Sequence, residues 1–292
     1  MILRVQGLIF CLLSFILIAI HFIPFHVEET SLRFLLILLV VVLGIPHGAL
    51  DTVLSQHLYK IKTFQHWMIF IFIYLSLSFL VVLTWWLAPT FFLAAFLLVS
   101  AYHFSTDPYE NVSWLFRVSY GASILVFPVL FYTQEMQTLF GFVSGANAAQ
   151  VVTHFLKMCA IPFLVFVFGL GLMHLKKNFY SSLELFFVIS IALFTPPLVA
   201  FSAFFCGMHS PRHMIRTYQC LKNLSSFRFL KAVFFPMLFI FVVFFISWVF
   251  LDKNKVDEGF IQILFIMLAA LTVPHMIIIE KFQILGKTSR GC

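Results

Sequence analysis

Five histidines at the ends of long apolar segments are the residues in this sequence best suited to chemistry. They are His47, His103, His209, His213 and His275, out of eleven histidines in a chain with only 10% charged residues. Neutral imidazole binds Fe, Zn, Cu or Ni in preference to Mg or Ca. Because ionisable residues in apolar segments usually serve a function, these histidines predict a transition-metal site.

Two of these histidines are each followed by an aspartate four residues later, as His47/Asp51 and His103/Asp107. Residues four apart share one face of a helix. The carboxylate there could accept the second ring N–H of a metal-bound imidazole and fix the ring's orientation. The alternative is that each aspartate marks the point where an apolar segment reaches water. The occurrence of two similar motifs favours the metal-site interpretation.

His209 and His213 form an H-x-x-x-H motif. On a continuous helix both rings would project from one face and bind one metal ion. The intervening Ser210-Pro211 is also typical of a helix N-cap followed by the first helical residue. In that case His209 would lie just outside the helix, so the spacing alone leaves the geometry open.

The other histidines and the cysteines receive no predicted role. No two cysteines have C-x-x-C spacing, so no thiolate metal site is expected. The remaining histidines stand in polar loops or near helix ends without an acidic neighbour, where they are expected to be interfacial; they are His21, His26, His57, His66, His154 and His174.

The composition defines the elements that must position the five histidines. Hydrophobic residues make up 62% of the chain, against roughly 45–50% in globular proteins. That excess excludes a soluble globular enzyme, a disordered chain and a nucleic-acid-binding module. The net charge of +7 is expected to reflect basic loops on the inner side of a membrane. The sequence therefore predicts an all-α, polytopic transmembrane helical bundle in the cell (inner) membrane.

About 20 apolar residues are needed to cross a bilayer as a helix. Because the first run is not followed by a small-x-small cleavage site, it is expected to be a retained span. We expect about 8–10 spans in a single integral membrane domain, residues 1–292. The candidate spans are 7–25, 33–50, 67–87, 89–105, 114–132, 158–175, 183–205, 229–251 and 260–279, with 138–155 as a more polar candidate.

Basic residues cluster around residues 60–62, 212–231 and 281–290. Placing all three clusters inside requires an even number of crossings between the first two, which gives eight or ten spans. With that parity the candidate ligands all lie near one face of the membrane.

At these residues the chain resembles the Brp/Blh family of membrane β-carotene 15,15′-dioxygenases. The matching segments follow the family's order along most of the chain; they are Gly44–Asp51 (GIPHGALD), Tyr102-His103-Phe104 with Asp107, His209–His213 (HSPRH) and Pro274-His275. Met208 stands where the family pattern has an aromatic residue before the third segment.

The resemblance implies a non-haem Fe(II) enzyme that cleaves β-carotene at its central 15,15′ double bond with O2, giving two all-trans-retinal molecules. It assigns the iron to His47, His103, His209 and His213, with no catalytic residues beyond the ligands. Asp51, Asp107, His275 and Arg212 are expected near the site. Arg212 would pair with Asp51 or Asp107, or face lipid phosphate. A retinal-using rhodopsin is an expected downstream partner.

β-Carotene is an apolar rod about as long as the hydrocarbon core is thick, ~30 Å. An enzyme that acts on it is therefore expected to take its substrate from the bilayer. Some of the 41 phenylalanines would line a tunnel, although most must serve lipid contact and packing. We expect Trp85, Trp86, Trp114 and Tyr218 among the tunnel residues.

Two other functions remain open from the residues alone. A di-iron membrane desaturase or hydroxylase needs several H-x-x-x-H and H-x-x-H-H motifs, whereas this chain has one H-x-x-x-H and no H-x-x-H-H. A metal or proton transporter would use pore histidines and often shows inverted repeats, which the sequence does not display.

Overall fold

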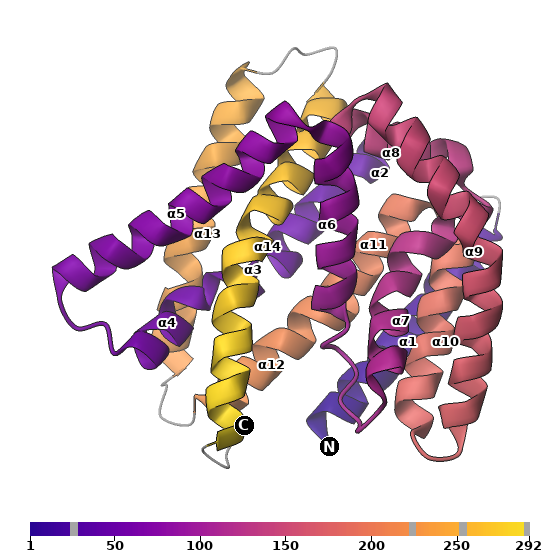
Figure 1. Cartoon of the computed structure of the whole chain (residues 1–292), viewed down its shortest axis with the longest axis horizontal. Helices are drawn as coiled ribbons and strands as arrows, with labels where there is room; N and C mark the ends of the chain where they lie inside the picture. The colour runs from indigo at the N-terminus through magenta and orange to yellow at the C-terminus, as the bar shows by residue number, and fades with distance from the viewer. Residues whose placement is uncertain (24–28, 222–225, 251–255, 289–292) are drawn as a thin grey trace.

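A computed structural model describes residues 1–23, 29–221, 226–250 and 256–288. Every regular element among these residues is a helix, which confirms the predicted all-α class (Figure 1). In chain order they are α1 (Ile2–His21), α2 (Glu29–Leu39), η1 (Val40–Gly44), α3 (Pro46–Ala49), α4 (Asp51–Tyr59), α5 (Phe64–Leu87), α6 (Pro89–Phe104), α7 (Trp114–Val126), η2 (Phe127–Leu130), α8 (Thr133–Ser144), α9 (Ala146–Leu175), α10 (Phe179–Phe194), α11 (Pro197–Phe204), η3 (Phe205–His209), α12 (Ser210–Cys220), α13 (Ser226–Phe250) and α14 (Val256–Thr288).

The long apolar helices are consistent with a multi-pass membrane protein. Among the described residues, five helical stretches are long and apolar enough to cross a bilayer: Ile2–His21, Thr30–Tyr59, Phe64–Leu87, Ala146–Leu175 and Glu258–Phe282. A sixth would be the pair Trp114–Leu130 and Thr133–Ser144, bent by 113°. Three shorter apolar helices, Pro89–Phe104, Phe179–Phe194 and Leu230–Val242, accompany them. The total of eight to ten spans therefore stays a prediction.

Two expected spans are not continuous helices. The run 138–155 is divided at Gly145, whose φ of +82° ends α8 and precedes α9. Such a backbone conformation is readily available only to glycine. The run 183–205 is broken after Phe194, because the prolines at 196 and 197 cannot continue the helix.

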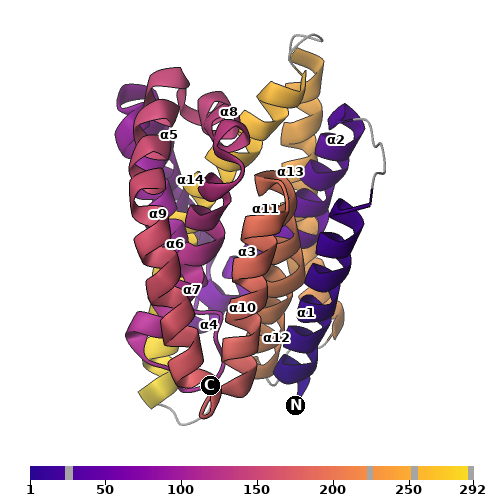
Figure 2. The same cartoon turned by 90° about the vertical axis from the view of Figure 1, so that its right-hand side faces the viewer.

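Helix α14 packs against α2, α4, α5, α6, α8 and α13. In Figure 1, α5 runs obliquely across α13 and α14, whereas Figure 2 shows α1, α10 and α9 as neighbours on another side. The close packing of α7 on α6 depends on Gly121. A Cβ atom there would lie 2.1 Å from the carbonyl oxygen of Ala101, so glycine alone permits α7 to approach the end of α6 that carries His103.

Candidate metal centre

The five histidines singled out in the sequence converge in one buried cluster. Each is at most 8% exposed. The His47 ring centroid lies 5.0 to 6.2 Å from those of the other four, and the centroids of His103 and His209 are 4.5 Å apart. The rings come from α3, α6, η3, α12 and α14, so segments far apart in sequence build the cluster.

Several imidazole nitrogens of the cluster lie close to one another, and two of them have no hydrogen-bond partner among the described residues. Ligand atoms of His47, His103 and His275 all lie within 4.8 Å of one another. Nε2 of His209 is 3.0 Å from Nε2 of His103. Nδ1 of His213 and Nε2 of His275 are buried and have no hydrogen-bond partner among the described residues. Because unpaired buried polar atoms are costly, this donor set fits a transition-metal ion.

The opposite ring nitrogens of three histidines are held by acceptors. Nδ1 of His275 donates to Oδ1 of Asp51 at 2.6 Å. Nδ1 of His209 donates to the carboxylate of Asp107 at 3.1 Å, and Nδ1 of His47 donates to the carbonyl of Gly44. This arrangement fixes the tautomer and leaves Nε2 for a metal.

The two aspartates therefore serve different histidines from those predicted. The pairs His47/Asp51 and His103/Asp107 are wrong, because the helix does not continue through either motif. α3 is only four residues long and α4 begins again at Asp51, which turns that side chain towards α14. α6 ends at Phe104, so Asp107 lies in the following loop and reaches His209.

The H-x-x-x-H motif lies on continuous helical backbone. Ser210 has helical φ and ψ angles and does not act as an N-cap; its hydroxyl donates to the carbonyl of Leu43 at 2.7 Å. His209 ends the π-helical turn η3 and His213 follows in α12, with ring centroids 6.1 Å apart. Both rings thus reach the same cluster.

Two π-helical turns stand at these histidines: η1 ends three residues before His47, and η3 ends at His209. Wide turns of this kind disturb the regular hydrogen bonding of the helix and are frequent at functional sites. Side chains from elsewhere bind carbonyls at or beside these turns: Ser210 binds Leu43, and Gln6 Nε2 binds Gly207 and Met208 at 2.8 and 3.2 Å. These bonds hold the two ligand-bearing segments in place.

Arg212 is fully buried and pairs with neither predicted aspartate carboxylate. Its guanidinium makes a two-pronged ion pair with Glu184, with both N–O distances at 2.8 Å, and donates from Nε to Gln6 at 2.8 Å. A further bond of 3.1 Å reaches the carbonyl of Asp107. Burial acts to lower the pKa of Arg212, but the ion pair with Glu184 outweighs burial and raises the pKa above its usual value. The lipid-phosphate alternative is therefore wrong.

A second arginine supports the same loop. Arg216 donates to the backbone carbonyls of Thr106 and Asp107. Burial lowers its pKa to about 10, so it remains charged at neutral pH. Arg212 and Arg216 thus act inside the protein rather than as loop charges that report sidedness. Sequence reasoning missed Glu184 and Gln6, since both lie far from any histidine motif.

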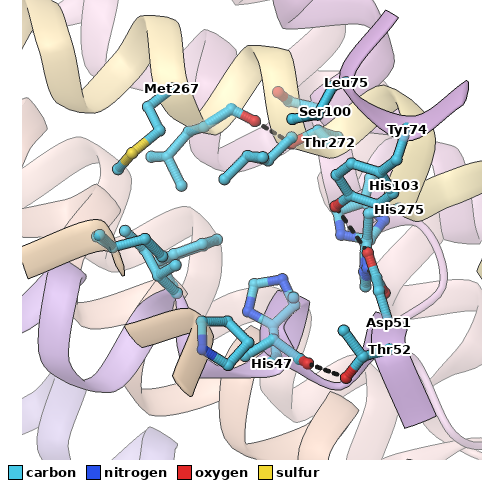
Figure 3. Close-up of a pocket in the computed structure, with 18 of the residues that line it drawn as sticks. His47, Asp51, Thr52, Tyr74, Leu75, Ser100, His103, Met267, Thr272 and His275 are labelled. Carbon is cyan, nitrogen blue, oxygen red and sulfur yellow. Dashed lines mark hydrogen bonds and ion pairs between the residues drawn. The ribbon is translucent and has the colours of Figure 1, made fainter. Parts of the chain in front are cut away.

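An apolar cavity of about 310 Å³ opens on the histidines. His47, His103 and His275 line it together with Asp51 and Tyr74, and the rest of its wall is mainly aromatic and aliphatic. In Figure 3, His103 and His275 lie beside Tyr74 and Asp51, and Met267 lies on the opposite side. The Tyr74 hydroxyl donates to Oδ2 of Asp51 at 2.9 Å. The cluster therefore presents imidazoles to a space suited to an apolar molecule.

Comparison with known proteins identifies the family. A family model described as beta-carotene 15,15′-dioxygenase matches residues 38–283, which include all five histidines. The chain belongs to the beta-carotene 15,15′-dioxygenase family. A curated relative from uncultured marine bacterium 66A03, named beta-carotene 15,15′-dioxygenase, is 30% identical over 261 residues, covering 83% of this chain and 90% of the relative. No solved structure matches the chain.

The four predicted tunnel residues of this family member lie outside the cavity beside the histidines, and their role in substrate passage stays a prediction. None of Trp85, Trp86, Trp114 and Tyr218 lines the cavity beside the histidines. Trp86 and Trp114 are 72% and 70% exposed, and Tyr218 is also exposed. The Trp85 indole donates to the carbonyl of Val143 at 2.7 Å, which directs it towards α8. Phenylalanines of the cavity, such as Phe96 and Phe201, take the expected place.

Proposed function

We propose that this protein cleaves β-carotene at the central 15,15′ double bond with O2, giving two all-trans-retinal molecules. The observation that carries the proposal is the convergence of five buried imidazoles, three of which (His47, His103 and His275) line an apolar cavity. The name of the marine relative supports the choice of substrate. Family membership argues against the di-iron desaturase and the transporter.

We propose that the metal is iron and that imidazoles alone supply its protein ligands. The resemblance assigns it to His47, His103, His209 and His213. We include His275 as a further ligand; this is supported by its Nε2, which has no partner among the described residues, and by its Nδ1, which is held by Asp51. A bound Fe(II) would supply the activation of O2 beside the alkene.

The side chains around the candidate metal centre orient its histidines and provide an apolar environment. Asp51 and Asp107 orient His275 and His209, and neither contacts a reacting atom in this proposal. The apolar cavity wall restricts water and holds the hydrocarbon. The substrate enters from the lipid bilayer of the cell (inner) membrane, where the chain acts as a single integral domain. A retinal-using rhodopsin would take up the product.

Expression in bacteria that make β-carotene tests the activity. We expect loss of orange colour and two retinal molecules per β-carotene consumed. Accumulation of eccentric apocarotenals would contradict central cleavage. Colour retained by cells that contain the folded, metal-loaded protein would contradict the proposed function.

Metal analysis of purified variants tests the ligand set. We expect one iron per chain in the unchanged protein and a large loss of iron in His47→Ala, His103→Ala, His209→Ala, His213→Ala and His275→Ala. His154→Ala is the matched control, because His154 is exposed on α9. Retention of iron by His275→Ala would remove that histidine from the ligand set, and retention by all five variants would refute the site.

A further inference from the structure

A second apolar cavity of nearly the same size adjoins the first. It has a volume of about 300 Å³, against about 310 Å³ for the cavity beside the histidines. It lies between α5, α14 and the segment that joins α4 to α5. Its wall is mostly aliphatic and includes Ile73, Leu77, Ile277 and Ile278. Neither the family match nor the histidine motifs points to this cavity.

Phe70 and Tyr74 line both cavities, so their side chains form the partition between them. On α14 the boundary falls at the candidate metal centre: His275 lines the first cavity, whereas its neighbour Pro274 lines the second. The Tyr74 hydroxyl is bonded to Asp51, which also holds His275. The partition is thus attached to the carboxylate that orients a candidate ligand.

Central cleavage sets a geometric requirement on the site. A symmetric rod cut at its middle leaves one half on each side of the metal, so each half needs a space of similar size. Along α14 the first cavity, of about 310 Å³, is lined by residues from Met267 to His275 and the second by residues from Pro274 to Ile278, so the two spaces flank the position of His275. The second cavity, beyond Tyr74, offers a matching space on the other side.

We propose that the second cavity receives one half of the polyene while the first holds the other half, and that Tyr74 and Phe70 form the gate through which the rod passes. This inference rests on the proposed function. The aliphatic wall suits a hydrocarbon, since its burial there removes apolar surface from water. Ile69 and Ile73 line the second cavity and are 57% and 54% exposed, so the cavity opens at the lipid-facing side of α5.

A lipid acyl chain has the same apolar chemistry and is the other candidate occupant. The two differ in one respect: a lipid in the second cavity would not make turnover depend on the length of the substrate. Comparison of a full-length substrate with one shortened at a single end therefore separates them.

The test fills the second cavity with Leu77→Trp. Leu77 lines only that cavity, and Leu80→Trp, on the exposed face of α5, is the matched control. We expect kcat/KM for β-carotene to fall about tenfold or more, because the added indole takes up the space assigned to one half of the rod. For β-apo-8′-carotenal, whose shorter arm needs less space, we expect less than about a twofold change. Leu80→Trp should match the unchanged protein with both substrates.

A second variant, Ile277→Trp, fills the same cavity from α14 and guards against a local defect in α5. An equal loss with both substrates in both variants would overturn the gate proposal, as would the absence of any loss. The lipid alternative predicts the latter result. If the unchanged protein cleaves neither substrate, the proposed function itself fails, whereas normal cleavage with no length dependence in the variants refutes only the second half-site.

Discussion

The two aspartates of the candidate metal centre each hold a histidine, but in very different surroundings. Asp107 is bonded through its carboxylate to His209, and its backbone carbonyl accepts hydrogen bonds from Arg212 and Arg216. Asp51 is bonded to His275 and to Tyr74, and it lines the cavity. The Asp107 side is therefore fixed by a buried ionic network, and the Asp51 side by a residue of the cavity wall.

Because of this difference, we expect substitutions around the two aspartates to have different effects. Changes on the Asp107 side should act mainly on folding and metal retention, because the network lies in the helix core. Changes on the Asp51 side should act on metal retention and also on turnover, because Tyr74 borders the space assigned to the substrate.

Loss of Glu184 should have the largest effect. Glu184→Ala leaves Arg212 as an unpaired buried charge, and removal of one partner from such a pair costs about 3–5 kcal/mol. We expect a strongly lowered unfolding temperature and a poor yield of protein in detergent. Glu135→Ala, at an exposed position of α8, is the control. Equal unfolding temperatures for the two variants would show that the network does not stabilise the fold.

Asp107→Asn and Asp51→Asn should each weaken metal binding about 10–100-fold, the usual effect of losing a carboxylate that orients a metal-bound histidine. Competition with a chelator measures this directly. The comparison predicts that Asp51→Asn alone also raises KM for β-carotene, since Asp107 does not line the cavity. A similar rise in KM for both variants would remove the distinction between the two sides.

Tyr74→Phe should have a smaller effect. It removes one hydrogen bond to Asp51, worth about 0.5–1.5 kcal/mol. We expect a several-fold change in steady-state kcat, with an unfolding temperature lowered no more than in the control variant below. Thr84→Val provides a control on α5, because its hydroxyl bonds only within the helix among the described residues. A lowered unfolding temperature in Tyr74→Phe alone would assign Tyr74 to the fold rather than to the site.

Trp86→Ala should have the smallest effect, within about 0.5 kcal/mol of the unchanged protein, as is usual for surface positions. Trp86 is 72% exposed and lies outside the cavities described above. Turnover assays with β-carotene measure the effect on activity, and thermal unfolding measures the effect on stability. A large loss of turnover would indicate that Trp86 contacts the substrate, as a tunnel residue would.

Residue type and hydropathy were sufficient to predict the helical class and the five histidines of the cluster. The partners of the aspartates were not predictable, because they depend on where helices stop: α3 after four residues and α6 at Phe104. The Arg212–Glu184 pair joins residues 28 positions apart on different helices, with no local motif to mark it. The residues that line the cavity were not predictable for a further reason, since an aromatic side chain facing lipid is as apolar as one facing a cavity.

The π-helical turns at His47 and His209 make the centre sensitive to chain length. Each holds one more residue in its turn than an α-helix would, and each residue of an α-helix advances the direction of the side chain by about 100°. Deletion of a single residue that such a wide turn does not absorb would swing the following imidazole by about 100°, away from its neighbours. The composition and hydropathy of the span would hardly change, so a shortened chain of this kind would still enter the membrane and lose its metal.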